Sequence, residues 1–290
     1  MRVLIAGAGG QLGRELSRTA PPTVTVKAAC RNDLDICDSA AVSAFFEDFQ
    51  PTLVINAAAY TAVDKAESEP DVAWRINAHG PALLAAAARN AVSCRLIHIS
   101  TDYVFDGNSS RPYTPRDEAA PLGIYGKSKL GGERAVLQEL GSRALVLRTE
   151  WVFGPYGKNF VHTMLKLMRE RGGVRVVDDQ FGCPTATASL AEALWAFAAR
   201  PGLAGVYHWT DAGVASWYDF AAAIAEDGSA CGLLPVDIEV SPIATSEYPT
   251  LAKRPRFSVL DWRATSAALG ISPLHWRVRL RRVLEEIKNA

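Results

Sequence analysis

The sequence lacks the features that would place it in several special classes of protein. Its 31 Lys and Arg residues balance 31 Asp and Glu residues, so no overall field favours nucleic acid or an anionic membrane. No apolar stretch of the chain is long enough to cross a bilayer. The five cysteines are scattered and form no C-x-x-C pair, which argues against a disulfide framework or a cysteine-ligated metal. These absences predict a cytoplasmic protein with reduced thiols that binds neither nucleic acid nor a membrane.

The remaining composition is that of an ordinary globular protein. The 290 residues are 49% hydrophobic and 21% charged, enough for a sizeable core in one or two domains. Short apolar runs alternate with helical patterns, which predicts a doubly wound parallel α/β sheet of the Rossmann type. The predicted strands cover residues 2–6, 24–26, 52–56, 95–99 and 144–148. The predicted helices cover residues 39–49, 70–77, 81–91, 125–140, 159–171, 189–199, 217–224 and 277–288.

A glycine-rich turn follows the first predicted strand. Gly7, Gly10 and Gly13 separate the apolar run Arg2–Ala6 from a helical pattern that begins near Arg14. Such glycines permit a tight turn and let the backbone approach a pyrophosphate, which the free N–H groups of a helix start can bind. The alternative is an ordinary strand–helix turn, but this context favours a dinucleotide site.

A tyrosine and a lysine stand four residues apart at the start of a predicted helix. Tyr125 and Lys129 therefore lie on one helix face. An ammonium beside a phenol favours the phenolate and lowers the pKa of the phenol, so the pair predicts a proton donor or acceptor for carbonyl–alcohol chemistry. By itself the spacing is more typical of a solvated helix face, and it gains weight only beside the glycine turn.

Polar residues also end two of the predicted strands. Asn56 follows one apolar run, and Ser100 and Thr101 follow another. Ligands of open α/β sheets bind at the carboxyl ends of strands, so these side chains are candidates for the site. Thr101 and the adjacent Asp102 could instead be turn-capping residues.

The strand–helix alternation becomes less regular after about residue 150, which predicts two parts. We expect residues 1–150 to form the NAD(P)-binding Rossmann domain. Residues 151–290 would mainly form a smaller substrate-binding α/β lobe, with elements at about 174–200 returning to the first domain. The polar segment Asp106–Ala120 contains Pro112 and Pro115 and predicts a mobile loop beside Tyr125 that closes over the substrate.

Longer segments carry a specific family resemblance over nearly the whole chain. With its glycine turn and Tyr-x-x-x-Lys pair, the sequence resembles the extended short-chain dehydrogenase/reductase family, and within it the branch of dTDP-4-dehydrorhamnose reductases. The matching segments are residues 10–13, 56–67, 100–107, 125–130, 151–154, 179–182, 184–185 and 254–255. The segments that begin at Asn56 and Ser100 are typical of this branch, whereas the glycines and the Tyr–Lys pair are not specific to it.

The resemblance implies NAD(P)H-dependent reduction of the C4 ketone of dTDP-4-dehydro-L-rhamnose to dTDP-L-rhamnose, the last step in making a donor for bacterial surface polysaccharide. Tyr125 would protonate the developing alkoxide, and Thr101 would hydrogen-bond the carbonyl oxygen. Lys129 would hold the nicotinamide ribose and lower the pKa of Tyr125. The implied substrate-binding residues are Thr101, Asp102, Tyr103, Phe105, Trp151 and Arg254.

For two of these substrate residues, the resemblance implies a specific role, and a structural role is the alternative. Trp151 would offer its aromatic face to the hexose, although it could equally be a core residue. Arg254 would bind the diphosphate with its guanidinium fork, although it could form a structural ion pair.

The resemblance also implies the cofactor site. The catalytic residues Tyr125 and Lys129 belong to it, together with Gly7, Gly10, Gln11, Leu12, Gly13, Arg31, Asp35, Ile36, Asn56, Ala57, Ala58, Ala59, Tyr60, Asn77 and Ser100. The second predicted strand has no acid at its end, where NAD-preferring sites place one. Arg31 stands there instead and could meet a 2′-phosphate. We therefore predict NADPH as the preferred cofactor, with NADH also possible.

Departures from the family pattern leave several alternatives open. Glu150 replaces a small residue before Trp151, Pro115 replaces an acid, and Cys183 replaces Ala or Ser, which affects substrate contacts rather than reaction type. The chain could therefore reduce another nucleotide-linked ketosugar. It could also resemble the non-catalytic regulatory subunit of methionine adenosyltransferase, although the retained Thr101, Tyr125 and Lys129 argue for catalysis.

The residues at a subunit-bridging metal site of the family bear on the expected oligomeric state. Some family members share a magnesium ion between subunits through glutamates. Glu15 matches one such position, but Ala188 stands near the other. We therefore predict no metal site and a protein that is a monomer or a weak homodimer. The only other binding partner that we predict is a small nucleotide-sugar substrate.

Overall fold

The computed structural model describes residues 1–290, and a six-stranded parallel sheet lies at its centre. The strand order is β10-β5-β4-β3-β1-β2. All five strand pairs are parallel, so the predicted α/β fold class is confirmed. The strands are β1 (Arg2–Ala6), β2 (Thr25–Ala29), β3 (Leu53–Asn56), β4 (Arg95–Thr101), β5 (Ala144–Thr149) and β10 (Gly205–His208). Strand β10, at one edge, was not predicted from the sequence.

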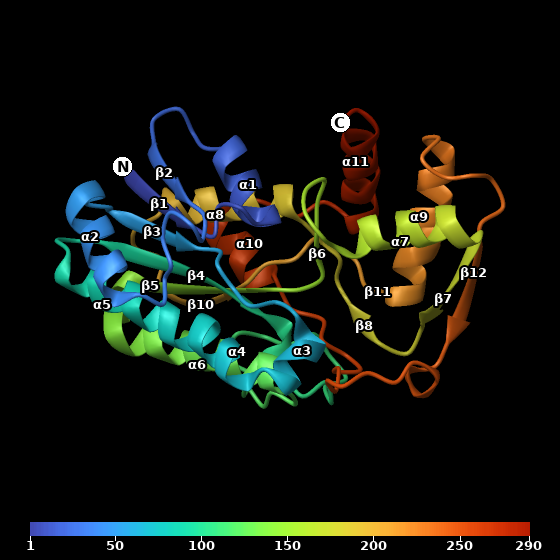
Figure 1. The fold of residues 1–290 in the computed structure, drawn as a ribbon, viewed down its shortest axis with the longest axis horizontal. Helices are drawn as coiled ribbons and strands as arrows, with labels where there is room; N and C mark the ends of the chain where they lie inside the picture. Colours follow the sequence, from blue (N-terminus) through green and yellow to red (C-terminus); the bar gives the residue numbers. More distant parts are fainter.

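Helices cover both faces of this sheet (Figure 1). Because successive strand residues point to opposite faces, Val3 and Ile5 of β1 join one core cluster, and Leu4 and Ala6 join the other. The first cluster includes residues of α1 (Gln11–Arg18) and α8 (Thr187–Ala198). The second includes residues of α2 (Ser39–Phe49), α5 (Gly80–Asn90) and α6 (Ile124–Leu140). This double burial explains why the central strands read as continuous apolar runs.

A second lobe has its own core, to the right of the sheet in Figure 1. The parallel strands β7 (Gly173–Val177) and β12 (Glu239–Ile243) pair there. Three helices contribute buried residues to the same core, namely α7 (Phe160–Arg171), α9 (Trp217–Ala230) and α11 (Trp276–Lys288). Helix α8 packs on the central sheet, whereas β7 pairs within the second lobe.

The remaining elements are short. They are α3 (Val63–Ser68), α4 (Pro70–Trp74), η1 (Arg75–His79), η2 (Asp102–Val104), η3 (Gly141–Arg143), β6 (Val152–Phe153), β8 (Phe181–Gly182), β9 (Thr185–Ala186), β11 (Ala215–Ser216), η4 (Thr245–Glu247) and α10 (Arg263–Leu269). The predicted helix at 70–77 is α4 followed by the π-helical turn η1. None of the helices combines the length and the apolarity that a membrane crossing requires.

A buried ion pair attaches α6 to the sheet. Arg148 of β5 donates from Nε and Nη2 to the two carboxylate oxygens of Glu133 of α6, at 2.9 and 2.7 Å. Both side chains are buried, and the guanidinium also lies 5.1 Å from the centre of the Phe105 ring. Because α6 carries Tyr125 and Lys129 in its first turns, this pair fixes the helix on which the candidate catalytic residues stand.

We expect Glu133→Gln to lower the free energy of unfolding by about 3 kcal/mol, because it leaves the Arg148 charge buried without a counter-charge. Urea denaturation followed by circular dichroism measures this loss. The control is Glu139→Gln on the same helix, which breaks the more exposed pair of Glu139 with Arg89 and should cost less than about 1 kcal/mol. Equal losses in the two variants would contradict the expectation.

Candidate functional site

The glycine turn between β1 and α1 brings the backbone of three segments close together. Gly7 has a φ of +82°, and a Cβ on it would lie 2.5 Å from the Ala58 nitrogen. A Cβ on Gly13 would lie 2.3 Å from the Gly7 carbonyl oxygen. Only glycine fits at these two positions. The turn can therefore present backbone N–H groups at the start of α1 to an anionic ligand.

A cavity of about 280 Å³ opens beside this turn. Its lining includes eight of the residues predicted for the cofactor: Gly7, Gly10, Arg31, Asp35, Ile36, Ala57, Ala58 and Ala59. The sequence reading missed Gly9, Leu34, Cys37 and Ile76, which also line it. Leu34 and Cys37 flank the predicted pair Asp35–Ile36, so the loop after β2 could have indicated them.

The other residues predicted for the cofactor lie outside this cavity lining. Gln11 donates from Nε2 to the Val152 carbonyl oxygen at 3.1 Å, which ties α1 to the second lobe. Leu12 is buried in the core between α1 and the sheet. Tyr60 follows the Ala57–Ala59 segment and donates its hydroxyl hydrogen to Glu69 at 2.5 Å. Ser100 is buried near the end of β4.

Two buried asparagines hold the backbone around the cavity. The Asn56 side-chain oxygen accepts from the Ala58 N–H at 3.1 Å. The Asn77 side chain accepts from the Tyr60 N–H at 2.8 Å and donates to the Tyr60 carbonyl oxygen at 3.0 Å. It also donates to the Ser128 hydroxyl at 3.1 Å. Asn77 lies in the π-helical turn η1, a feature that occurs often at functional sites.

The three predicted catalytic residues meet where β4 ends and α6 begins. Thr101 is the last residue of β4, and its hydroxyl donates to Asp102 Oδ1 at 2.9 Å and accepts from the Tyr103 N–H at 3.2 Å. The Tyr103 ring packs edge-to-face on the Tyr125 ring at 5.6 Å between ring centres. A Cβ on Gly126 would lie 2.1 Å from the Tyr103 carbonyl oxygen, so glycine at this position lets α6 approach the Thr101 turn.

The pKa values of the Tyr–Lys pair differ from the sequence expectation. Burial raises the pKa of Tyr125 to about 12, although the nearby Thr101 hydroxyl opposes that rise. Burial lowers the pKa of Lys129 to about 8. The expected lowering of the tyrosine pKa by lysine does not outweigh burial, and the Lys129 ammonium donates to the Ile99 carbonyl oxygen at 2.6 Å. Tyr125 therefore keeps its proton at neutral pH, as a proton donor must.

The residues predicted for the substrate divide into two groups. Asp102 and Tyr103 adjoin Thr101, whereas Phe105 is completely buried and stacks on Tyr113 at 4.1 Å. The structure therefore does not bring Phe105 to the site. Its aromatic side chain fills a core instead, as aromatic residues commonly do.

Trp151 belongs to an aromatic group that the sequence indicated only in part. Its backbone has a φ of +47°, a conformation that a bulky residue rarely adopts. Its ring stacks on Trp217 at 3.5 Å between centres, and Phe160 lies 4.7 Å from Trp217. Both tryptophans are only partly buried, so this stack offers an apolar wall. Trp217 had no sequence signal beyond its residue type.

Arg254 forms the ion pair that the sequence left as an alternative. Its guanidinium donates to both carboxylate oxygens of Asp64, at 2.8 and 3.3 Å. The Ala252 N–H donates to the same carboxylate at 3.2 Å. The pair connects α3 with the 252–256 loop near Tyr103. Arg254 would have to share or exchange this partner to bind a diphosphate.

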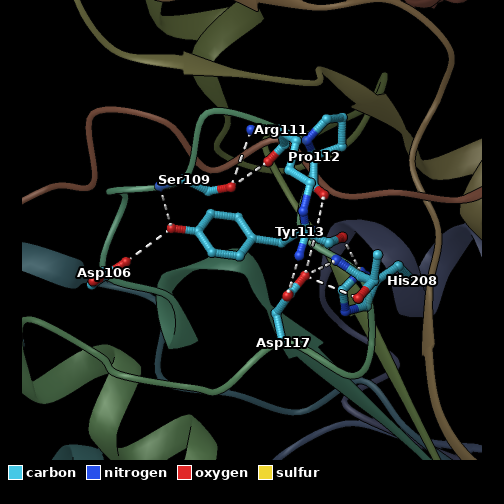
Figure 2. A network of polar contacts seen from close by, with 8 residues as sticks. Asp106, Ser109, Arg111, Pro112, Tyr113, Asp117 and His208 are labelled. Carbon is cyan, nitrogen blue, oxygen red and sulfur yellow. Dashed lines mark hydrogen bonds and ion pairs between the residues drawn. The ribbon is translucent and has the colours of Figure 1, made fainter.

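The Asp106–Ala120 segment has no helix, as expected, but hydrogen bonds attach it firmly (Figure 2). The Tyr113 hydroxyl donates to Asp106 at 2.9 Å and accepts from the Ser109 N–H at 3.1 Å. Arg111 pairs with Asp117 at 2.7 Å, and the Tyr113 carbonyl oxygen lies 3.0 Å from His208 Nδ1. The contact with His208 attaches the segment to β10, and the closure of the segment over the substrate stays a prediction.

Comparisons with known proteins agree with this arrangement of site and fold. The family model described as RmlD substrate binding domain matches residues 1–289. A dTDP-4-dehydrorhamnose reductase of Aggregatibacter actinomycetemcomitans is 43% identical over 289 residues, covering 97% of this chain and 98% of that protein.

Two solved structures are also similar over nearly their full length. The crystal structure of a dTDP-4-dehydrorhamnose reductase from Clostridium acetobutylicum has a TM-score of 0.93 at 40% identity, covering 99% of this chain and 100% of that one. The reductase of Bacillus anthracis in complex with NADP has a TM-score of 0.91 at 36% identity, covering 98% and 99%. By its sequence over 289 residues and by its fold, the chain belongs to the RmlD substrate binding domain family.

Proposed function

We propose that this protein is a nucleotide-sugar ketoreductase that reduces the C4 ketone of dTDP-4-dehydro-L-rhamnose to dTDP-L-rhamnose with NADPH. The observation that carries the proposal is the placement of Thr101 beside Tyr125, with the Lys129 ammonium hydrogen-bonded to the carbonyl oxygen of Ile99 in the same strand, β4. Relatives at about 40% identity over the full length bear the name of this reductase, which supports this substrate.

The residues around the cavity fit a dinucleotide. Gly7 lets the turn pack against the Ala57–Ala58 backbone, and Gly13 lets α1 pack against the turn itself, which gives the tight strand–helix turn that dinucleotide sites use. Gly10 precedes the first turn of α1, where free N–H groups and the helix dipole favour phosphate. When bound, the nicotinamide supplies the hydride that reduces the ketone carbon.

The chain's own residues then supply the proton and stabilise charge. Tyr125 gives its phenolic proton to the ketone oxygen as negative charge develops there. Its raised pKa keeps the proton in place until that moment. Thr101 donates a hydrogen bond to the same oxygen, which lowers the energy of the transition state. Lys129 is buried beside them and stabilises the phenolate that remains, until solvent restores its proton.

We assign the cofactor to residues 1–150 and the sugar mainly to residues 151–290. The stacked Trp151 and Trp217 give the second lobe an aromatic wall, which suits the apolar face of a deoxyhexose. Asp102 and Tyr103 would border the sugar from the sheet side. Arg254 would take the diphosphate by exchanging its contact with Asp64, since its fork matches phosphate oxygens.

The loop after β2 favours NADPH over NADH. Arg31 lines the cavity and can pair with a 2′-phosphate. The nearby acids already have partners: Asp33 accepts from the Cys30 N–H at 2.9 Å, and Asp35 accepts from the Cys37 N–H at 3.0 Å. Each carboxylate keeps a second oxygen, so the proposed preference rests on Arg31. The relative from Bacillus anthracis, solved with NADP, supports the same choice.

Replacement of the proton donor tests the reaction. We expect Tyr125→Phe to lower kcat by about 10² to 10⁴, the usual value of a positioned acid. Oxidation of NADPH in the presence of dTDP-4-dehydro-L-rhamnose measures kcat, and NADPH fluorescence reports cofactor binding, which should persist. The control is Tyr218→Phe on α9, which removes a hydroxyl from the second lobe. Full activity of the Tyr125 variant would exclude it as the proton donor.

Replacement of Arg31 tests the cofactor preference. We expect Arg31→Ala to raise KM for NADPH about tenfold and to leave KM for NADH nearly unchanged, because only NADPH carries the 2′-phosphate. Steady-state kinetics with both cofactors measure the two values. The control is Arg75→Ala, which replaces an exposed arginine of η1. A wild-type enzyme that uses NADH as efficiently as NADPH would contradict the preference.

The lowered pKa of Lys129 gives a pH dependence. The charged ammonium exists below about pH 8 and is lost above it, so we expect kcat/KM to fall as pH rises through this value. Tyr125, with a pKa of about 12, does not titrate in that range. A profile measured from pH 6 to pH 9.5 that stays flat would show that the charge of Lys129 is not needed.

A further inference from the structure

The helix that carries the proposed proton donor begins without a cap of its own. Helix α6 starts at Ile124, and the residue before it, Gly123, has no side chain that could accept a hydrogen bond from the first turn. The first N–H groups of a helix need such acceptors, which Ser, Thr, Asp or Asn at the preceding position usually supply. Tyr125 is the second residue of this helix, so a loosely held first turn would leave its phenol loosely placed.

A carboxylate from a distant segment supplies the missing acceptor. Glu67 of α3 lies 57 residues before Ile124 in the chain, and its Oε1 accepts from the Ile124 N–H at 2.7 Å. A Cβ on Gly123 would lie 2.5 Å from the same oxygen, so a residue able to cap the helix locally would displace Glu67. The negative charge also suits the positive end of the helix dipole. The chain therefore caps α6 through a tertiary contact, one residue before Tyr125.

A second contact holds the other side of Tyr125. The Ser128 hydroxyl donates to the Tyr125 carbonyl oxygen at 2.8 Å and accepts from the Asn77 side chain at 3.1 Å. Asn77 thus fixes the peptide group after Tyr125, while Glu67 fixes the start of the helix before it. The Tyr125 backbone is therefore held by two elements, α3 and η1, that come earlier in the chain.

Helix α3 is itself held in place, so Glu67 is presented from a fixed support. Asp64, one turn before Glu67, accepts from the Arg254 guanidinium at 2.8 Å and from the Ala252 N–H at 3.2 Å. Ala66, which lies between the two acids in the chain, is completely buried. A carboxylate on an anchored helix can set the position of its partner, whereas one on a free surface loop would follow that partner.

We propose that Glu67 is a positioning residue that holds the first turn of α6 so that the Tyr125 hydroxyl meets the substrate ketone oxygen. The inference rests on the proposed function, and it concerns a residue that acts through the backbone of α6. Proton transfer requires the donor to lie within hydrogen-bonding distance of that oxygen. Because a misplacement of about 1 Å can cost about 10²-fold in rate, a cap beside the proton donor affects the chemical step and not only the stability of the fold.

Two substitutions of Glu67 separate positioning from stability. Glu67→Ala removes the acceptor, whereas Glu67→Gln keeps an oxygen that can accept from the Ile124 N–H. We expect kcat of the Ala variant to fall at least about tenfold, with KM for NADPH little changed, and the Gln variant to retain most of the wild-type kcat. The control is Lys65→Ala, which removes an exposed side chain from the same helix and should leave kcat unchanged. Wild-type kcat in the Ala variant, or an equal loss in the Gln variant, would overturn the proposal.

Fluorine NMR tests the position of Tyr125 without turnover. Protein labelled with 3-fluorotyrosine gives a Tyr125 signal that is identified by its absence from Tyr125→Phe, and the other tyrosine signals report whether each variant folds. We expect Glu67→Ala to shift the Tyr125 signal, and Glu67→Gln and Lys65→Ala to leave it in place. An unshifted signal in the Ala variant would also overturn the proposal.

The test stays decisive if a variant does not fold or if the substrate is wrong. If Glu67→Ala does not fold, Glu67→Asp, whose shorter side chain withdraws the carboxylate, should give the same loss of kcat and the same shift of the signal. Wild-type values in the Asp variant would then overturn the proposal. If the Tyr125 signal shifts as expected but the wild type does not reduce dTDP-4-dehydro-L-rhamnose, the proposed substrate fails while the positioning role stands.

Discussion

The close approach of α6 to the end of β4 is the constraint on which the site depends. A side chain on Gly126 or Gly132 would meet the carbonyl oxygen of Tyr103 or Asn77 at about 2 Å. With glycine there, the helix backbone lies against the two turns that carry the polar residues of the site. The Glu133–Arg148 pair holds the same helix on the sheet from behind. Tyr125 thus lies close to Thr101 because the backbone of α6 packs closely on the turn that follows β4, and not because either side chain is long.

The parts of the fold with strong local signals could be predicted from the sequence. Apolar runs identified the central strands because both sheet faces are covered, and Tyr125 and Lys129 were recognisable from helical spacing. Strand β10 was missed because its four residues are mostly half-buried at a sheet edge and carry no periodic pattern. The pKa of Tyr125 could not be predicted either, since it depends on burial and on the neighbouring Thr101 and Asp102 side chains.

The second lobe shows a different limit of sequence reading. Trp151 was indicated by its family motif, but its stacking partner Trp217 is far away in the chain, and only folding brings the rings together. The same holds for Arg254 and Asp64, whose pairing joins a loop to α3. Contacts between distant segments carry no local periodicity. Such contacts therefore cannot be predicted from the spacing of residues in the sequence, although they shape the candidate sugar site.

The route of the chain has a consequence for how the molecule folds. After β5 the chain enters the second lobe, returns for α8 and β10, leaves for α9, returns for α10, and ends in α11 (Figure 1). Each lobe is thus formed by several segments that are separated in the sequence. Neither can be excised as one continuous fragment, and loss of one removes covering helices or strands from the other. Such interleaving couples the two cores into one cooperative unit, so proteolytic nicks should not release a stable half.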